Sequence, residues 1–414
     1  MKIIYVNGFK IRDIFGDMNF NLLGRNPDWD YHWYIPPKEI WIEKRAKKET
    51  EFLIRTDNLE KKFDPRNKRD YWKLRKIMAQ KLKQPQNISL DSITLKKYTM
   101  NGNTIRIVRG NLVRKYLDYG FIIGGHSEVY PWYIPTKEIW LDDAVEPAER
   151  KYILVHENLE YNLMKKGAGY GKAHDLACVA EEASRVHDGI ATYTIHNPIA
   201  PLPFLKINEL SRKRVLVVSG IHGNEPSGPY AIAKYLLQNK KTEKGIDIAP
   251  ILNPTGFEKG TRKNAGGKDL NRFFFDQAIR GEPEECTIAR NFLKRVTKPY
   301  ELLLSIHEDY ERKEFYLYEA GNGINSKVIR NIFSIIKKAG IELFNGLDDK
   351  ELGNLVIDGH VPMETNDQFP ALEEFVSRTR KAKRVITLEI PGRLPLERKI
   401  NLGVLIIKAV VESL

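Results

Sequence analysis

The sequence of 414 residues has very little cysteine, since only Cys178 and Cys286 occur in it. Two cysteines in a chain of this length do not build a disulfide framework, and residues 1–8 lack the apolar segment typical of a signal peptide. We therefore expect neither secretion nor a disulfide-stapled scaffold. A reducing, cytoplasmic compartment fits this composition best.

Long apolar runs are also missing. The most apolar stretch, residues 402–411, is interrupted by Lys408 and is shorter than the roughly 18 apolar residues that a membrane span needs. Hydrophobic residues make up 42% and charged residues 29% of the chain, as in folded domains. Because 414 residues exceed one ordinary core, we expect a soluble protein of two or three domains, with no membrane partner.

Acidic residues are outnumbered by basic ones, 54 against 67, which gives a net charge of +13. Residues 1–100 carry most of this excess, with 22 basic and 13 acidic side chains. A basic run that includes Tyr71 and Trp72 lies at 61–83. We interpret the run as a solvated helix face, and contact with nucleic acid or another polyanion is the alternative.

The N-terminal half contains an internal repeat. The segment WYIPPKEIW at 33–41 recurs as WYIPTKEIW at 132–140, and Asn-Leu-Glu at 58–60 recurs at 158–160. Such self-similarity predicts two related small α+β modules, residues 1–100 and 101–194, each with strands followed by two helices. We interpret the Trp-Tyr-Ile-Pro elements as core and turn. We recognise no family for these modules.

The pattern changes after a proline-containing stretch near residue 195. Apolar strand-like segments then alternate with amphipathic helical ones, which predicts an α/β domain over 195–414 with a largely parallel sheet. The expected strands are 213–219, 246–252, 301–306, 315–318 and 384–390, and the expected helices are 226–238, 283–296, 326–338 and 402–414.

Candidate metal ligands follow the predicted strands of this domain. Ligand sites gather at the carboxyl edge of such sheets, where His222 and Glu225 lie in a glycine-containing turn. These two side chains can converge on one cation, and His307 at a later strand end would complete three ligands with an open position, as in catalytic zinc sites. Glu389 is a single carboxylate within an apolar strand, which is costly unless it has a role or a partner.

Six motifs occur in a fixed order: His-x-x-Glu at 222–225, Asn-Pro-x-Gly at 253–256, Arg-x-Asn at 262–264, Asp-Leu-Asn-Arg-x-Phe at 269–274, the strand-end His307, and Glu-x-Pro-Gly at 389–392. In this order they resemble the zinc metallocarboxypeptidase superfamily, including its succinylglutamate desuccinylase and aspartoacylase branch. The resemblance covers residues 195–414 and implies an α/β/α sandwich with a mixed, largely parallel sheet.

The resemblance also implies roles for individual residues. His222, Glu225 and His307 would bind one Zn²⁺, and Glu389 would be the general base. Further roles fall to residues in the middle motifs: Arg262 would stabilise the oxyanion, and Asn264, Asn271 and Arg272 would bind substrate, the last two through its carboxylate.

The implied activity is zinc-dependent hydrolysis of an amide bond next to a free carboxylate, in an N-acyl amino acid or at a peptide C-terminus. No tyrosine follows Tyr318, so the mobile tyrosine of pancreatic-type peptidases has no counterpart, and 366–369 occupy its region. This favours the deacylase branch. The alternatives are a strict metallocarboxypeptidase on peptides or cell-wall peptides, or an inactive binding protein whose basic first module recruits nucleic acid.

The second module contains a further cluster of ligand-type residues. His156 and Glu160 stand four residues apart on a predicted helix, and His174 lies on the next one. The pattern resembles the His-Glu-x-x-His zinc helix with Glu in the last place. We expect a second Zn²⁺ on these three residues with Glu157 as a base, and the alternative is a helix pair held by ordinary His–Glu contacts.

The first module differs at the matching positions. It has Thr56, Asp57 and Glu60 on the first helix and Arg75 on the second. We therefore expect a degenerate site there, in which Arg75 places a cation where the metal would be.

Overall fold

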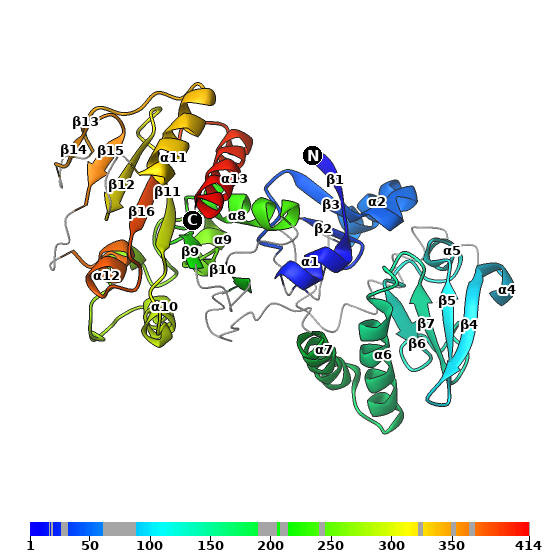
Figure 1. The fold of residues 1–414 in the computed structure, drawn as a ribbon. Helices are drawn as coiled ribbons and strands as arrows, with labels where there is room; N and C mark the ends of the chain where they lie inside the picture. Colours follow the sequence, from blue (N-terminus) through cyan, green and yellow to red (C-terminus); the bar gives the residue numbers. More distant parts are fainter. Residues whose placement is uncertain are drawn as a thin grey trace. The chain divides into compact units, whose positions relative to one another are not determined.

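The computed structural model divides into two compact units, Met1–Thr192 and Tyr193–Leu414 (Figure 1), and each is described by itself. The division of the N-terminal unit at residue 100 stays a prediction. No helix in the described part of the chain is long and apolar enough to cross a membrane. The structure describes residues 1–15, 17, 20–25, 32–60, 88–188, 205–207, 214–239, 245–321, 326–348, 353–363 and 369–413.

The C-terminal unit contains a seven-stranded sheet in the order β15-β12-β16-β11-β9-β10-β8. Four neighbouring pairs are parallel, whereas β8 and β12 run antiparallel to β10 and β16. The predicted mixed, largely parallel sheet is therefore confirmed. Its strands are β8 (Leu205–Ile207), β9 (Arg214–Ser219), β10 (Gly245–Ala249), β11 (Leu302–Asp309), β12 (Tyr316–Ala320), β15 (His360–Pro362) and β16 (Val385–Pro391).

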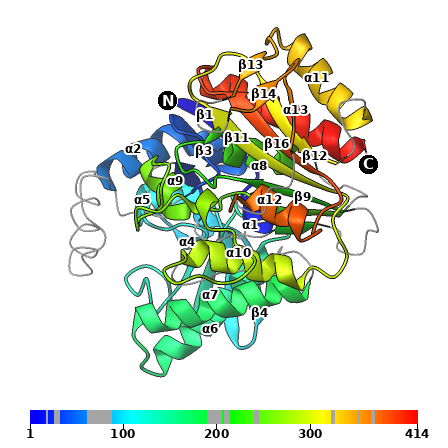
Figure 2. The ribbon, with the colours of Figure 1, turned by 90° about the vertical axis from the view of Figure 1, so that its left-hand side faces the viewer.

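Helices cover both faces of this sheet (Figures 1 and 2). On one face α8 (Ser227–Gln238) packs against α13 (Leu396–Glu412) so closely that a Cβ on Gly403 would lie 2.6 Å from the Ala231 Cβ. On the other face α10 (Glu284–Arg295) and α12 (Leu372–Arg378) pack on the sheet core. Because both faces are covered, β9 is an uninterrupted apolar run, as in parallel sheets. The remaining elements are α9 (Pro254–Lys259), η2 (Leu270–Arg272), α11 (Lys327–Lys338), β13 (Gly346–Leu347) and β14 (Leu355–Val356).

The expected strands and helices of this unit all occur. The largest shift is at α13, which begins six residues earlier than expected because its first turn is polar and shows no apolar periodicity. The edge strand β8, the short strands β13 to β15 and the seven-residue helix α12 were not predicted. The prolines near residue 200 lie outside the described residues.

The N-terminal unit contains the same arrangement twice. In the first copy β1 (Lys2–Val6) runs parallel to β3 (Glu39–Glu43), and β2 (Leu23–Arg25) runs antiparallel to it. The second copy repeats this with β5, β7 and β6 and adds β4. The elements not yet given bounds are α1 (Gly8–Phe15), η1 (Lys44–Glu49), α2 (Thr50–Glu60), α4 (Leu90–Ile93), β4 (Thr94–Met100), β5 (Asn103–Val108), α5 (Gly110–Tyr116), β6 (Gly124–His126), β7 (Glu138–Asp142), α6 (Arg150–Lys165) and α7 (Tyr170–His187).

The repeated Trp-Tyr-Ile-Pro elements supply core and turn, as expected. Ile35 and Ile134 are buried, and Lys38 and Lys137 adopt left-handed backbone at the turn before the strand. Trp132 departs from this interpretation, since it is 55% exposed.

Two buried ion pairs join the copies reciprocally. Arg12 Nε donates to Glu149 at 2.7 Å, and Arg114 Nε donates to Glu49 at 2.7 Å. The arginines lie on the first helix of each copy and the glutamates precede the long helix, so each copy gives an arginine to the other's glutamate. Guanidinium–carboxylate pairs of this kind fix relative orientation.

Candidate active site

The turn after β9 depends on two glycines. Gly220 has a φ of 61°, which is in the left-handed region that favours glycine. A Cβ on Gly223 would lie 1.9 Å from the carbonyl carbon of Gly256, so no larger residue fits there. This tight turn brings His222 and Glu225 together before α8 begins.

Three predicted ligands converge at the carboxyl ends of β9 and β11. The Glu225 carboxylate lies between two imidazoles, 2.7 Å from His222 Nδ1 and 3.1 Å from His307 Nδ1. One donor atom of each residue lies within 4.8 Å of the others, and all three residues are buried. Because both Nδ1 atoms face the same carboxylate, the three side chains form a pre-shaped cation site.

The outer nitrogens of the two imidazoles also face carboxylates. His222 Nε2 lies 3.3 Å from Asp269, and His307 Nε2 lies 3.1 Å from Glu373. Metal-bound histidines commonly hold an outer carboxylate in this way, which fixes the ring and its tautomer. Asp269 was part of a recognised motif but was given no role, and Glu373 was missed because α12 was not predicted.

The two carboxylates in contact with His307, those of Glu225 and Glu373, favour their ionised form. Burial raises the pKa of Glu225 and Glu373, but the facing imidazoles outweigh burial and lower each pKa to about 2. Burial lowers the pKa of His307, yet the same two carboxylates raise it well above its ordinary value. The cluster therefore attracts positive charge, which suits a divalent cation.

Glu389 lies beside the three ligands. It is the parallel register partner of His307 on the neighbouring strand β16, so both side chains leave the same face of the sheet. Burial raises the pKa of Glu389 to about 8. A carboxyl group with this pKa can take up and release a proton near neutral pH.

Arg262 reaches the same cluster. Its Nε donates to Asp269 Oδ2 at 2.9 Å, and its Nη1 lies 3.8 Å from Glu225. The side chain is 45% exposed, so its guanidinium can contact both solvent and a bound molecule.

The other predicted substrate-binding residues differ in their surroundings. Asn271 is buried, and its amide donates to Glu373 at 3.2 Å and accepts from the Leu372 backbone at 2.9 Å. Arg272 stacks its guanidinium on the Phe369 ring, 4.8 Å from the ring centre. Asn264 instead faces Glu285 at 3.2 Å.

The predicted second cluster also comes together, between α6 and α7, which lie side by side (Figure 2). Glu160 Oε2 lies 2.8 Å from His174 Nδ1 and 3.5 Å from His156 Nε2. Sequence reasoning missed two members, His126 and Cys178. The spacing of four residues between His174 and Cys178 was the available signal.

Glu157 occupies a different part of this cluster. It is 8% exposed and faces β6, where a Cβ on Gly124 would lie 3.0 Å from its carboxylate. Burial raises its pKa to about 7. Hydrogen bonds with His156 and His174 lower the pKa of the Cys178 thiol to about 7.

The first module has a buried cation at the β2 position that corresponds to His126. Arg25, the β2 counterpart of His126, pairs with Asp57 at 2.5 Å and is 7% exposed. Arg75 and the basic run at 61–83 lie outside the described residues.

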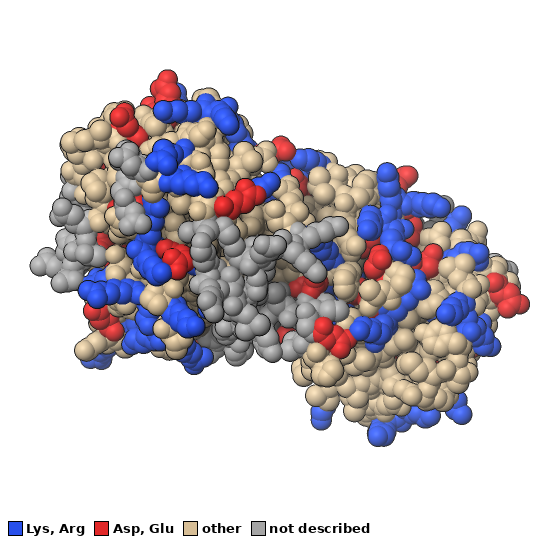
Figure 3. All heavy atoms as spheres, viewed as in Figure 1, with Lys and Arg blue, Asp and Glu red and all other residues tan. Residues whose placement is uncertain are grey.

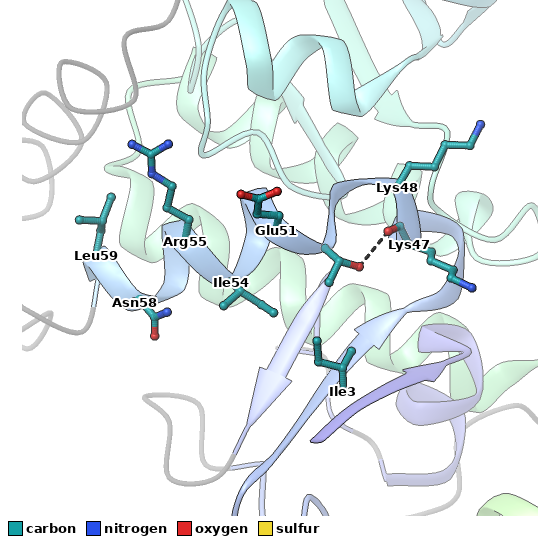
Figure 4. A pocket seen from close by; sticks show the side chains of 9 residues that line it. Ile3, Lys47, Lys48, Glu51, Ile54, Arg55, Asn58 and Leu59 are labelled. Atoms are coloured by element: carbon teal, nitrogen blue, oxygen red, sulfur yellow. Dashed lines mark hydrogen bonds between the residues drawn. The ribbon is translucent and has the colours of Figure 1, made fainter. Parts of the chain in front are cut away.

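A pocket of about 790 Å³ lies on the first module, along α2 (Figure 4). Lys47, Lys48 and Arg55 line it together with apolar side chains, and it contains none of the predicted site residues. On the visible face in Figure 3, Lys and Arg are interspersed with Asp and Glu.

Comparison with known proteins identifies a relative of the C-terminal unit. Residues 211–391 match the model of the family described as succinylglutamate desuccinylase/aspartoacylase catalytic domain. A probable aspartoacylase of Prochlorococcus marinus strain MIT 9215 is 41% identical over 63 residues, 15% of this chain and 20% of that protein. Carboxypeptidase D of Homo sapiens is 31% identical over 110 residues, 22% of this chain and 8% of that protein.

Among solved structures, a succinylglutamate desuccinylase from Silicibacter sp. TM1040 aligns with a TM-score of 0.36 and 17% identity, covering 51% of this chain and 60% of that one. The chain spans a fifth or less of the length of these two curated relatives. The family match confirms the resemblance seen in the sequence and its expectation of a hydrolase. The matched range, residues 211–391, includes His222, Glu225, His307 and Glu389.

Proposed function

Since the C-terminal unit carries a succinylglutamate desuccinylase/aspartoacylase catalytic domain, we propose that the protein is a zinc-dependent hydrolase that cleaves an amide bond next to a free carboxylate. The observation that carries the proposal is the convergence of His222, Glu225 and His307 with Glu389 beside them. The substrate is a small N-acyl amino acid or a peptide that loses its C-terminal residue.

The residues present fit the metal. His222 and His307 would bind through Nδ1, the atoms that face Glu225. Two imidazoles and one carboxylate are a donor set of catalytic zinc sites, and three ligands leave a position open. When bound, Zn²⁺ lowers the pKa of a water ligand toward neutrality and polarises a carbonyl oxygen.

Glu389 is the proposed general base. Its carboxylate accepts a proton from the attacking water and then delivers this proton to the leaving nitrogen, which departs as an amine. Burial of Glu389 supports the role, because it raises the pKa of the group that must hold the proton between the two steps. A cation on the neighbouring ligands would lower this pKa and favour the base form.

Two arginines are the proposed substrate contacts. Arg262 is half exposed beside Glu225, where it can donate to the oxyanion that forms from the substrate carbonyl. Arg272 would bind the free carboxylate through its planar guanidinium, and Phe369 holds that plane by stacking. Asn271 is a positioning residue in this scheme, since its amide is engaged by Glu373 and Leu372. We propose no substrate contact for Asn264.

A strict metallocarboxypeptidase is the second candidate, favoured by the similarity to part of carboxypeptidase D. The absence of tyrosine after Tyr318 favours the deacylase instead. We further propose a cytoplasmic location and three domains, 1–100, 101–194 and 195–414. In this division, the first two modules position the enzyme or its substrate.

The test is product detection by mass spectrometry with the full chain. Zinc-loaded protein is incubated with N-acyl amino acids, peptides with varied C-termini and cell-wall peptides, and Glu389→Gln serves as the inactive control. Release of a free amino acid from the acylated compounds by the wild type alone supports the deacylase, and release only from peptides supports the carboxypeptidase. No product from folded, zinc-containing wild type would contradict hydrolysis and favour a binding protein.

A further inference from the structure

We infer that His156, His174 and Cys178 form a second metal site in the N-terminal unit, for Zn²⁺ or another cation that accepts a thiolate and two imidazoles. This inference is independent of the proposed function of the C-terminal unit. It also revises the expected ligand set, because Cys178 enters it and Glu160 becomes a support for a ligand.

The three donors lie on two packed helices. His156 comes from α6, whereas His174 and Cys178 stand one turn apart on α7. One donor atom of each lies within 4.8 Å of the others, with 3.7 Å between Cys178 Sγ and His174 Nε2. The two imidazole rings meet edge to face at 4.9 Å.

The remaining ring nitrogens face carboxylates on the outside of the cluster. His174 Nδ1 lies 2.8 Å from Glu160 Oε2, and His156 Nδ1 lies 3.2 Å from Glu181 Oε2. His174 Nε2 lies 3.7 Å from Cys178 Sγ, and His156 Nε2 lies 3.5 Å from Glu160 Oε2, so both Nε2 atoms lie within the cluster and are the proposed metal-binding atoms. This is the arrangement that orients metal-bound histidines in proteins.

His126 explains why Glu160 is fixed in its outer position. The Nδ1 atom of His126 accepts the backbone N–H of Glu128 at 3.2 Å, so the ring proton sits on Nε2. That Nε2 donates to Glu160 Oε1 at 3.0 Å. Because both of its nitrogens are used in this way, we assign His126 to the support of Glu160.

The chemistry of the donors selects the metal. A thiolate with two imidazoles favours Zn²⁺ over Mg²⁺ or Ca²⁺, which prefer oxygen ligands. Three protein ligands leave a fourth position open, and the His174 side chain is 40% exposed, so an ion can enter from solvent.

The first module carries a guanidinium on the same framework. Arg25 stands at the position of His126 and pairs with Asp57, the counterpart of Glu157. In the described part of the second module, no Lys or Arg ion pair reaches Glu157 or Glu160; the partners of Glu160 are three imidazoles. Glu160 in the second module is therefore paired with imidazoles, whereas Asp57 in the first module is paired with a guanidinium.

Cobalt substitution of the full chain tests the inference. The protein is stripped of metal, loaded with Co²⁺, and measured for metal content and for the near-ultraviolet charge-transfer band of a thiolate bound to cobalt. This band reports only a cysteine ligand, whereas the C-terminal site has none. Cys286→Ala is the matched cysteine control, because Cys286 is buried in the apolar core of the other unit.

We expect the band in wild type, in His222→Ala and in Cys286→Ala. Cys178→Ser should lose both the band and one equivalent of metal per chain. His174→Ala should also lose one equivalent, whereas His187→Ala on the same helix, with an 88% exposed side chain, should lose none. A folded wild type without the band, or metal content unchanged by both Cys178→Ser and His174→Ala, would overturn the second site. Loss of metal in His222→Ala alone would support only the proposed function.

Discussion

The two proposed metal-ligand clusters of this chain share one design on different scaffolds. In the C-terminal unit the ligands stand on a turn and at strand ends, and the outer nitrogens of His222 and His307 face Asp269 and Glu373. In the N-terminal unit the ligands stand on two helices, and the outer nitrogens face Glu160 and Glu181. Outer carboxylates thus mark both clusters, although no fold is shared.

The third ligand distinguishes the clusters. The C-terminal cluster uses the carboxylate of Glu225 and has Glu389 beside it, in the position that a base needs. The N-terminal cluster uses the thiol of Cys178, and its additional carboxylate, Glu157, faces the sheet instead. This difference is the reason why we propose a catalytic role for the first cluster and metal binding alone for the second.

The largest expected effect is on catalysis at the C-terminal cluster. Glu389→Gln removes the proton acceptor but keeps the size of the side chain, so we expect kcat to fall by about 10²- to 10⁴-fold. Metal content should stay at the wild-type value at both clusters, because the ligands are intact. Product release and metal analysis on the same samples measure this, and wild-type turnover in the variant would exclude Glu389 as the base.

The next effect concerns the cation of the first module. Arg25→Met leaves Asp57 without its buried partner, and we expect the free energy of unfolding to fall by about 3–5 kcal/mol. Arg55→Met, an exposed residue on α2, should change it by less than about 0.5 kcal/mol. Denaturant titration with and without Zn²⁺ measures both. If Zn²⁺ restored the free energy of unfolding of Arg25→Met, a metal ion could replace the guanidinium in the first module.

The sequence predicted the ligands and the base of the C-terminal cluster better than the carboxylates that face the outer nitrogens of these ligands. His222 and Glu225 are close in sequence, His307 stands near a predicted strand end, and Glu389 is a carboxylate within an apolar strand; the resemblance of the ordered motifs supplied the roles of all four residues. Glu373 lies on the seven-residue helix α12, which is too short to show a helical apolar pattern in the sequence. Its contact with His307 joins residues that are 66 positions apart, so no local pattern predicts it.

The N-terminal cluster shows the same limit. His156, Glu160 and His174 could be predicted from helical spacing, because these contacts are local or join consecutive helices. The equivalence of Arg25 and His126 could not, because it depends on the antiparallel pairing of β2 with β3 and of β6 with β7. The expectation for Arg75 stays a prediction, because this residue lies outside the described residues.

Substitution of the outer carboxylates Glu373 and Glu160 is expected to have an effect of intermediate size on metal binding. Each variant is the control for the other. Glu373→Gln should weaken metal binding or activity at the C-terminal cluster by about 10- to 100-fold, and Glu160→Gln should do the same to binding at the N-terminal cluster. Neither should affect the other cluster. Competition with a chelator, followed through the cobalt band and through activity, separates the two. Equal loss at both clusters would contradict two independent sites.

The smallest effect is expected at Phe369, which stacks on Arg272 at 4.8 Å. Phe369→Leu keeps an apolar side chain and removes the ring, and a cation–π contact at a partly exposed site contributes about 0.5–1 kcal/mol, or roughly a two- to five-fold change. Because Arg272 is proposed to bind the substrate carboxylate in ground and transition states alike, the change should raise KM and leave kcat and metal content unaltered. Steady-state kinetics on the substrate found by product screening measures this. A fall in kcat with unchanged KM would instead indicate that Phe369 lies against the reacting centre. Arg272 would then be the residue that stabilises the oxyanion, and Arg262 the one that binds the substrate carboxylate.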